Sequence, residues 1–245
     1  MEKINFRLAK PEDNYGLLDL AHAVSMKGDI EILFKRNPDF FDACEIQGFE
    51  YQILVATRFD KTICASGVRV LKNVYINGNP RVIGYLGDLK VAATARKLRI
   101  LANGYKKMKE LHQDGRAALH ITAIIDDNKD AKAALVWKNK DQSIPNYYDV
   151  GCINTYFVFP FFPGFSLNTL KIVRGNKDII GDIVLFLNTE GMKKQFFPVY
   201  TCEYFLNLRQ FNISDFYVAY DGNQIVGVAA TWDQSAFKQV VLKQY

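Results

Sequence analysis

The sequence predicts an α/β fold, an α+β arrangement around a mixed sheet, in which mostly antiparallel strands are followed by a parallel pair. Two hairpin signals in the first third of the chain predict an antiparallel meander. A basic amphipathic helix follows it, and the nearly all-apolar run after that helix is typical of a central strand covered on both faces. With 245 residues and 49% hydrophobic composition, the chain can bury a sizeable core.

The chain opens with a strand pattern and two helix patterns. Apolar residues at every second position from Ile4 to Leu8 predict a half-buried strand. Pro11 and the two acids after it favour a helix N-terminus. A second helix is expected from about residue 30 to 45, interrupted at Asn37-Pro38.

Two hairpins come next. The apolar and β-branched stretches 51–57 and 62–70 are joined by a short turn at 59–61. The turn sequence from Asn77 to Pro80 then leads into a strand from Tyr85 to Val91. This strand is therefore expected to end the meander.

A basic helix and a buried run complete the first unit. Apolar residues recur at three- and four-residue steps from Leu98 to Leu111, with lysine and arginine on the other faces. The run from Ala118 to Ile125 is expected to be a strand, and Asn128 to cap the short helix after it. Strand character resumes from Tyr147 to Phe159.

The sequence also predicts a second, shorter unit. The stretch 170–178 echoes 5–13, and 216–227 echoes 51–67, at nearly the same spacing along the chain. The predicted domains are residues 1–162 and a partial copy of that unit at 167–245.

Composition limits the class of protein. The four cysteines are far apart and the three histidines have no ligand spacing, so we expect a reducing compartment and no metal. The start lacks a signal-peptide pattern, and the longest apolar stretch, 156–165, is too short and too broken by prolines to cross a bilayer. A cytoplasmic protein with no membrane partner is expected. The net charge of +5 suits an anionic ligand, but the aromatic platform of nucleic-acid modules is missing, so no nucleic-acid partner is expected.

Three stretches carry a family resemblance. They are Asp88-Leu89-Lys90-Val91, Arg96-Lys97-Leu98-Arg99-Ile100-Leu101, and Asn128 three residues before Ala131. In this order of elements they resemble the GNAT superfamily of acyl-CoA N-acyltransferases, over roughly residues 3 to 159 with a partial second copy from about 167. The resemblance implies acetyl-CoA or another acyl-CoA as cosubstrate.

The resemblance also implies how the cosubstrate binds. In the family, backbone amides at a helix N-terminus bind the coenzyme A pyrophosphate within the pattern Arg/Gln-x-x-Gly-x-Gly/Ala. Arg96 matches this pattern, whereas Arg99 and Leu101 stand where the family has glycine, and glycine or alanine. Either Lys97 and Arg99 replace amide contacts with charged ones, or cofactor binding is weakened or lost. The implied cofactor-binding residues are Leu89, Lys90, Val91, Arg96, Lys97, Leu98, Arg99, Ile100, Leu101 and Asn128.

Direct acyl transfer needs a base for the amine and an acid for the leaving thiolate. Strand alternation places Asp88 opposite the face of Gly87 and Leu89, beside the expected thioester, so Asp88 is the candidate base. A strand-end aspartate that only hydrogen-bonds a loop is the alternative. The family often has a tyrosine seven residues after the helix asparagine, but Leu135 stands there. Tyr147, or the tyrosine after it, is the candidate acid, with simple packing as the alternative.

Two functions follow from this reading. The first is an N-acyltransferase, by default an acetyltransferase, that moves an acyl group from acyl-CoA to a primary amine of a small molecule or peptide by direct transfer. The alternative is a catalytically inactive GNAT-fold module that binds a ligand or a protein, because the glycines and the tyrosine are missing. Strand edges between residues 225 and 241 would pair with the first unit or with another chain, which leaves a homo-oligomer open.

Overall fold

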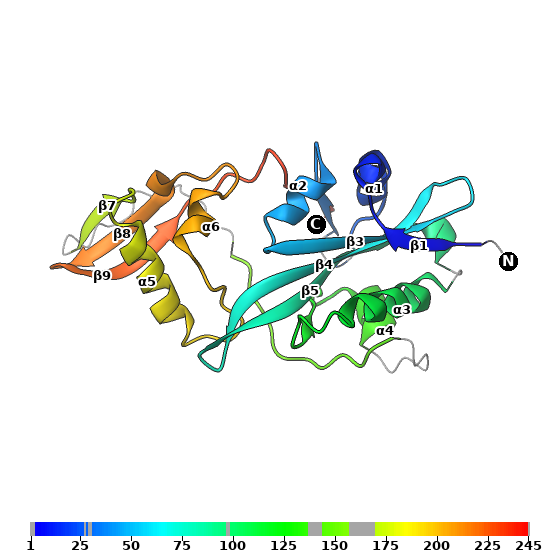
Figure 1. Ribbon diagram of the computed structural model, residues 1–245. Coiled ribbons are helices and arrows are strands. Elements are labelled where there is room, and N and C mark those ends of the chain that lie inside the picture. The colour runs from blue at the N-terminus through cyan, green and yellow to red at the C-terminus, as the bar shows by residue number, and fades with distance from the viewer. Residues whose placement is uncertain are drawn as a thin grey trace. The chain divides into compact units, whose positions relative to one another are not determined.

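The computed structural model describes residues 3–26, 28, 31–96, 99–136, 144–156 and 170–244 (Figure 1). The chain forms two compact units, and each is described by itself. Unit 1 comprises Met1–Asn146, Gly191–Val199 and Asp233–Tyr245, and unit 2 comprises Tyr147–Glu190 and Tyr200–Trp232. The domain boundary predicted between residues 162 and 167 falls outside the described residues.

Unit 1 is built on a five-stranded sheet in the order β1-β3-β4-β5-β6. The strands are β1 (Asn5–Leu8), β3 (Glu50–Thr57), β4 (Ile63–Ile76), β5 (Asn79–Val91) and β6 (His120–Ile121). The first four pair antiparallel, whereas β5 and β6 pair parallel. The predicted mixed sheet, an antiparallel meander followed by a parallel pair, is therefore confirmed.

Helices cover both faces of this sheet. Figure 1 shows α1 (Asn14–Ala23) and α2 (Phe40–Glu45) on one face and α3 (Ile100–His112) on the other. The predicted start of α1 is confirmed, because a 3-10 turn at Pro11–Asp13 leads into it. Asp13 then holds the turn to β1 through a 2.6 Å ion pair with Arg7.

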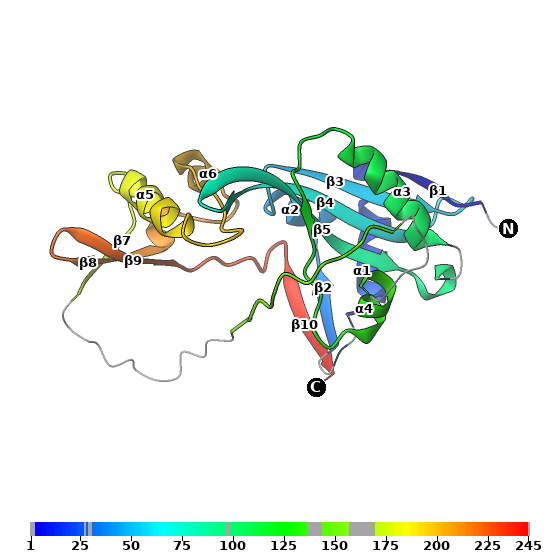
Figure 2. The ribbon, with the colours of Figure 1, turned by 90° about the horizontal axis from the view of Figure 1, so that it is seen from below.

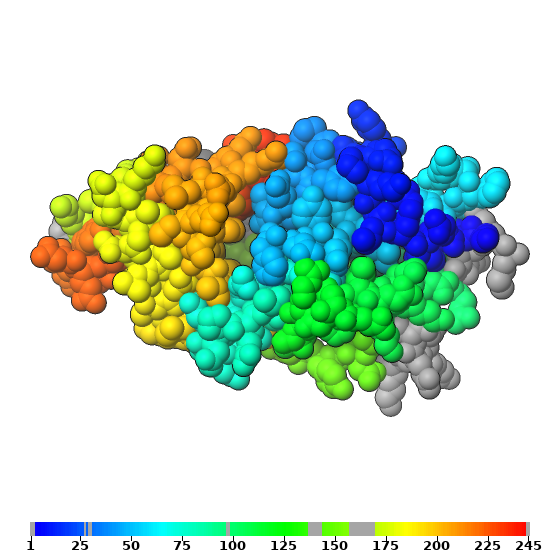
Figure 3. Space-filling view, in the orientation of Figure 1, coloured from blue at the N-terminus to red at the C-terminus, as the bar shows by residue number. Residues whose placement is uncertain are grey.

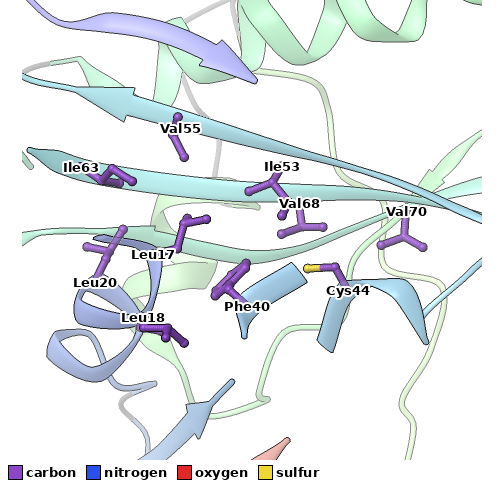
Figure 4. Packing of buried hydrophobic residues seen from close by; sticks show 11 residues of the cluster. Leu17, Leu18, Leu20, Phe40, Cys44, Ile53, Val55, Ile63, Val68 and Val70 are labelled. Carbon is purple, nitrogen blue, oxygen red and sulfur yellow. The ribbon is translucent and has the colours of Figure 1, made fainter. Parts of the chain in front are cut away.

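The main core of unit 1 lies between α1, α2 and the sheet. Figure 4 shows side chains of the two helices turned toward the strands, and Phe40 of α2 is fully buried among them. Burying one such side chain is worth about 1.5–3 kcal/mol. The buried cluster consists of Leu17, Leu18, Leu20, Ala21, Phe40, Cys44, Ile53, Val55, Ile63, Val68 and Val70.

A long-range strand pair replaces the first part of the helix predicted from residue 30 to 45. The strand β2 (Glu31–Lys35) pairs antiparallel with β10 (Gln239–Gln244), and the two lie side by side in Figure 2. Only the second half, α2, is helical. The prediction failed because the strand partner comes from the far end of the chain. The expectation that the C-terminal strands pair with the first unit is met by β10.

Two other predicted strands are shorter or missing. Of the run 118–125, only His120 and Ile121 join the sheet, opposite Gly84 and Tyr85 of β5. Residues 122–125 leave the ladder, and β5 itself is bulged just beyond Tyr85. Within the strand predicted at 147–159, the described residues 147–156 form neither strand nor helix.

Unit 2 has a three-stranded antiparallel sheet in the order β7-β8-β9. Its elements are β7 (Lys171–Arg174), α5 (Ile180–Gly191), α6 (Cys202–Leu206), β8 (Phe216–Asp221) and β9 (Gln224–Ala230). The core around Ile183, Phe205 and Val218 joins the helices to the sheet. A strand, two helices and a hairpin thus follow in the order of β1, α1, α2, β3 and β4, without a counterpart of β2 among the described residues of unit 2.

Candidate functional site

A bulge in β5 decides which way the candidate residues point. Between the pairs Ser66–Lys90 and Val68–Gly87, β5 contains one residue more than β4. Asp88 lies in this bulge with a left-handed backbone, φ 48°. The simple alternation that predicted Asp88 opposite Gly87 therefore does not hold here.

Asp88 turns toward β2 and forms a buried ion pair. Nη2 of Arg36 donates to Oδ1 and Oδ2 of Asp88 at 3.0 and 3.1 Å. The Arg36 and Asp88 side chains are 9% and 6% exposed. The carboxylate of the candidate base is therefore already paired with a cation, with which an acceptor ammonium would have to compete.

The three residues after Asp88 point in different directions. Leu89 is exposed, whereas Val91 packs against the small core under α3. Lys90 is 2% exposed, and its Nζ donates to the carbonyl of Val24 at 2.6 Å. Burial lowers the pKa of Lys90. A ligand along this strand would thus meet its backbone and Leu89, not the Lys90 ammonium.

The turn before α3 keeps an unusual backbone conformation. A 3-10 turn at Ala93–Ala95 leads to Arg96, and Arg99 just before the helix has φ 52° and ψ 29°. This left-handed conformation is one that glycine adopts readily and other residues rarely do. Lys97 and Leu98, both expected at the cofactor, lie outside the described residues.

The N-terminus of α3 has free amides and nearby positive charge. The first hydrogen bond of the helix runs from the Asn103 amide to the Arg99 carbonyl at 3.1 Å, so the N–H groups before it have no partner within the helix. The Arg99 side chain makes no capping bond, and the first turn contains no acid. Arg96 and Arg99 are exposed, and Figure 3 shows α3, in green, at the surface of unit 1. Cations at the positive end of a helix dipole are unfavourable alone and favourable beside an anion.

The side chains of the first α3 residues do not reach outward together. Ile100 is buried in the cluster beneath the helix, and Leu101 is half-buried. Only their backbone amides are placed to contact an anion at the helix start.

The two remaining candidates, Asn128 and Tyr147, belong to other elements than β5 and α3. Asn128 caps α4 (Lys129–Leu135), accepting a hydrogen bond from the Ala131 amide at 2.9 Å, so the predicted cap is confirmed. Tyr147 is half-buried in an irregular stretch and is part of unit 2. The structure thus does not bring Tyr147 and Asp88 together within one unit.

Sequence reasoning missed Arg36. Its partner Asp88 lies 52 positions further along the chain, and no local pattern marks that distance. The missed strand β2 hid it further, because a helix from 30 to 45 would have turned Arg36 elsewhere. In the structure Arg36 is only 7% exposed, and a buried arginine is almost always paired with an acid. Burial, which the sequence alone does not give, is the signal that would have pointed to the pair.

Other chemistries have little support among the residues that the structure describes. All four cysteines are free thiols, and no group of three or more His, Cys, Asp or Glu side chains is placed to hold a metal ion. In the same residues, every helix is too short or too polar to span a membrane.

The sequence matches no family model and no curated protein. In structure it is similar to an acetyltransferase from Trypanosoma brucei, with 12% identity, TM-score 0.40, and coverage of 60% of this chain and 100% of that one. It is also similar to glucosamine-6-phosphate N-acetyltransferase from Arabidopsis thaliana, with 17% identity, TM-score 0.42, and coverage of 60% and 100%. A third is ribosomal-protein-alanine N-acetyltransferase from Brucella melitensis, with 13% identity, TM-score 0.45, and coverage of 63% and 99%. All three of these neighbours are acetyltransferases by name.

Proposed function

We propose that unit 1 is a GNAT-like N-acyltransferase that moves an acyl group, by default acetyl, from acyl-CoA to a primary amine of a small molecule or peptide. The single observation that carries the proposal is the left-handed backbone of Arg99 directly before α3. Arginine stands at a position where the resembled family has glycine, yet the chain still takes the conformation that glycine favours. The turn proposed to present amides to a phosphate thus has the left-handed conformation that glycine favours, with arginine at that position.

The charges around this turn support the same proposal. Arg96 stands near helix amides that have no partner within the helix, and a cation at this end of a helix is favourable only beside an anion. A pyrophosphate would accept hydrogen bonds from the amides and pair with the Arg96 guanidinium.

The separation of β5 and β6 gives the cosubstrate a place to extend. The two strands pair at Gly84 and Tyr85, but residues 122–125 leave the ladder while β5 continues to Val91. Backbone groups of Leu89 and Val91 would then be available to the amides of a pantetheine arm. Asn128 at the start of α4 is proposed to face that arm.

The proposed reaction forms one bond and breaks one. The amine nitrogen attacks the thioester carbonyl carbon, the C–N bond forms, and the C–S bond breaks as the tetrahedral intermediate collapses. Asp88 is proposed to take the proton that the amine loses. The thiolate gains a proton from water, and because a thiol has a pKa near 8.5 the thiolate is a tolerable leaving group without a dedicated acid.

One observation favours a second function, a module that binds acyl-CoA or a protein without turnover. The carboxylate of Asp88 is already paired with Arg36 at 3.0 Å, so an acceptor amine would have to displace the guanidinium to reach it. In that case, the cofactor corner would be retained and the base would serve only to hold β2 against β5.

Calorimetry with acetyl-CoA tests the cofactor site. We expect binding in the wild-type protein, and a weakening of roughly tenfold in Arg96→Ala, as loss of one charge-assisted contact predicts. Lys109→Ala is the matched control, because it removes an exposed cation from the last turn of the same helix. No heat of binding at millimolar acetyl-CoA would rule out the transferase and the acyl-CoA-binding module, and would leave only a module that binds a protein.

Release of free coenzyme A in the presence of a panel of amines separates the two functions. Turnover that is lost in Asp88→Asn supports the transferase, whereas binding without turnover supports the second function.

We also propose that unit 2 is a partial second copy of unit 1, because its strand, two helices and hairpin follow in the order of β1, α1, α2, β3 and β4, with no strand in the place of β2 among its described residues. In both units the first strand pairs antiparallel with the first strand of the hairpin. On this proposal, unit 2 ends before the elements that correspond to β5 and α3 and has no cofactor corner of its own.

A further inference from the structure

Cations outnumber acids around the bulge of β5. Arg36, Lys72, Lys90 and Lys238 gather there with the single carboxylate of Asp88, from β4, β5 and the segments flanking β2 and β10. Their charges act on one another: those of Arg36 and Asp88 reach both Lys90 and Lys238, and that of Lys238 reaches Lys72. In the described part of unit 1, Asp88 is thus the one carboxylate among the charges that act on Lys90 and Lys238.

Arg36 is only partly satisfied by Asp88. A single nitrogen, Nη2, makes both contacts to the carboxylate. The other two, Nε and Nη1, are buried and have no hydrogen-bond partner among the described residues. Burying a guanidinium in this way is unfavourable, because Nε and Nη1 lose their hydrogen bonds to water and gain none from the described residues.

Among the described residues, the two outer lysines, Lys72 and Lys238, also make no ion pair with an acid. The Nζ of Lys72 lies 4.8 Å from the centroid of the Tyr85 ring, a cation–π contact that orients the ammonium without neutralising it. Burial, together with the charge of Lys238, lowers the pKa of Lys72. Lys238 has a pKa lowered by burial and by the charge of Arg36. Lys90, in contrast, already donates to the Val24 carbonyl.

We propose that Arg36, Lys72 and Lys238 form an anion-binding site that takes the carboxylate or phosphate group of the acceptor. The assignment of the bound anion to an acceptor rests on the proposed transferase function, whereas the anion site itself does not. Ammonium and guanidinium groups recognise both anions through charge-assisted hydrogen bonds. Lys72, Tyr85 and Lys238 are half-buried, so the cluster retains contact with water and is not a sealed interior.

The site also indicates which acceptors are unsuitable. A polyamine, or a peptide rich in lysine, would bring more positive charge to a cluster that already has an excess of it. A small amine with one anionic group would neutralise the cluster and could place its nitrogen near Asp88. The substrate class we infer is therefore a compact anionic amine, namely an amino acid or an amine phosphate ester.

The anion site can be tested without any acyl-CoA. We expect inorganic phosphate, compared with chloride at equal ionic strength, to raise the Tm of the wild-type protein. The shift should be lost in Lys238→Met and Lys72→Met, which keep the apolar stem and remove the charge. It should persist in Lys109→Met, the exposed cation of α3. Both cluster variants should also be more stable than the wild type without phosphate, because each removes a buried like charge.

The outcomes separate the anion site from the transferase. Absence of a phosphate shift in the wild type, or an undiminished shift in both cluster variants, overturns the anion site and leaves an ion pair that is structural only. If acetyl-CoA fails to bind while the phosphate shift behaves as expected, the transferase fails and the anion site stands.

The acceptor class is tested by paired substrates that differ only in the anion. We expect kcat/KM for O-phosphoethanolamine to exceed that for ethanolamine by roughly tenfold to a hundredfold, the range of one charge-assisted hydrogen bond. The ratio should fall toward one in Lys238→Met. Equal rates for the two amines, or a preference for putrescine, would overturn the inferred acceptor class.

Discussion

Nη2 of Arg36 lies 3.0 Å from Oδ1 of Asp88 and 3.1 Å from its Oδ2, so one nitrogen holds both oxygens of the carboxylate. The pair joins the end of β2 to the bulge of β5, and both side chains are almost fully buried. Its geometry makes Asp88, the proposed base, a residue on which local structure depends.

Removing one partner of this pair should cost more stability than removing both. In Asp88→Ala the guanidinium stays buried without any counter-charge, and breaking a buried pair in this way typically costs about 3–5 kcal/mol. The double variant Arg36→Met with Asp88→Ala removes the stranded charge as well. We expect it to be more stable than Asp88→Ala alone in urea unfolding. A double variant that is less stable by the sum of the two single effects would contradict a direct coupling.

Glycine at position 99 should stabilise the turn before α3. Arg99→Gly and Arg99→Ala both remove the charge, but only alanine retains the cost of a left-handed backbone. We expect the glycine variant to be more stable than the alanine variant by about 1 kcal/mol in chemical unfolding. If acetyl-CoA binds, the glycine variant should bind it more tightly than the alanine variant. Equal stability of the two would mean that the left-handed turn is absent in solution.

His120 should make the protein sensitive to moderate acid. Its Nε2 lies 3.2 Å from Nε of Arg69, which donates to it, so the nitrogen must be unprotonated. Burial, followed by the nearby charges of His112 and Arg69, lowers the pKa of His120 to about 4. The unfolded chain, with a pKa near 6.5, therefore binds the proton more readily. The stability that depends on neutral His120 is complete above pH 6.5 and is lost as the pH falls toward 4.

The measurement is the slope of Tm against pH between 6.5 and 4, in the wild type and in His120→Gln. Glutamine keeps an acceptor for Arg69 but does not titrate, so the slope should flatten. One full proton of difference between the folded and unfolded states would change the free energy of unfolding by roughly 1.4 kcal/mol per pH unit. Because His120 is only half-buried, we expect a much smaller change. Asp114, whose pKa is lowered by its hydrogen bonds to Arg69 and Arg116, loses its contribution only in stronger acid. An unchanged slope in His120→Gln would assign the acid sensitivity to another group.

Phe40→Ala should destabilise unit 1 severely. The ring is fully buried between α2 and the sheet, and such truncations cost about 3–5 kcal/mol. Phe59→Ala is the matched control, because its ring is 96% exposed and its loss should change stability by less than about 0.5 kcal/mol. Similar unfolding midpoints for the two variants would place the core of unit 1 elsewhere.

Local signals predicted the parts of the fold that local interactions determine. The hairpins of β3, β4 and β5 follow their turns, and Asn128 caps its helix because an asparagine side chain reaches the amide three residues on. The strand β5 and the basic helix α3, on either side of the proposed cofactor corner, were likewise predicted from the sequence.

The remaining parts depend on contacts between distant residues. The strand β2 forms because β10 pairs with it, and the Glu31–Lys35 sequence by itself fits a helix as well. The bulge at Asp88 changes the face of the sheet toward which this side chain points. The alternation of apolar and polar residues in the strand does not indicate the extra residue. The partnership of Asp88 with Arg36, and with it the cluster of cations, therefore could not be predicted.

The pairing of β2 with β10 sets a time order for making the protein. During synthesis, a ribosome releases β2 early and β10 only after nearly all of unit 2 has been made. Until then β2 has an open edge, and Lys238 has not joined Arg36 and Lys72. A nascent or prematurely terminated chain would thus contain the cofactor corner without a complete anion site. A chain cut by a protease before Lys238 would lose both the strand partner of β2 and one cation of the proposed anion site.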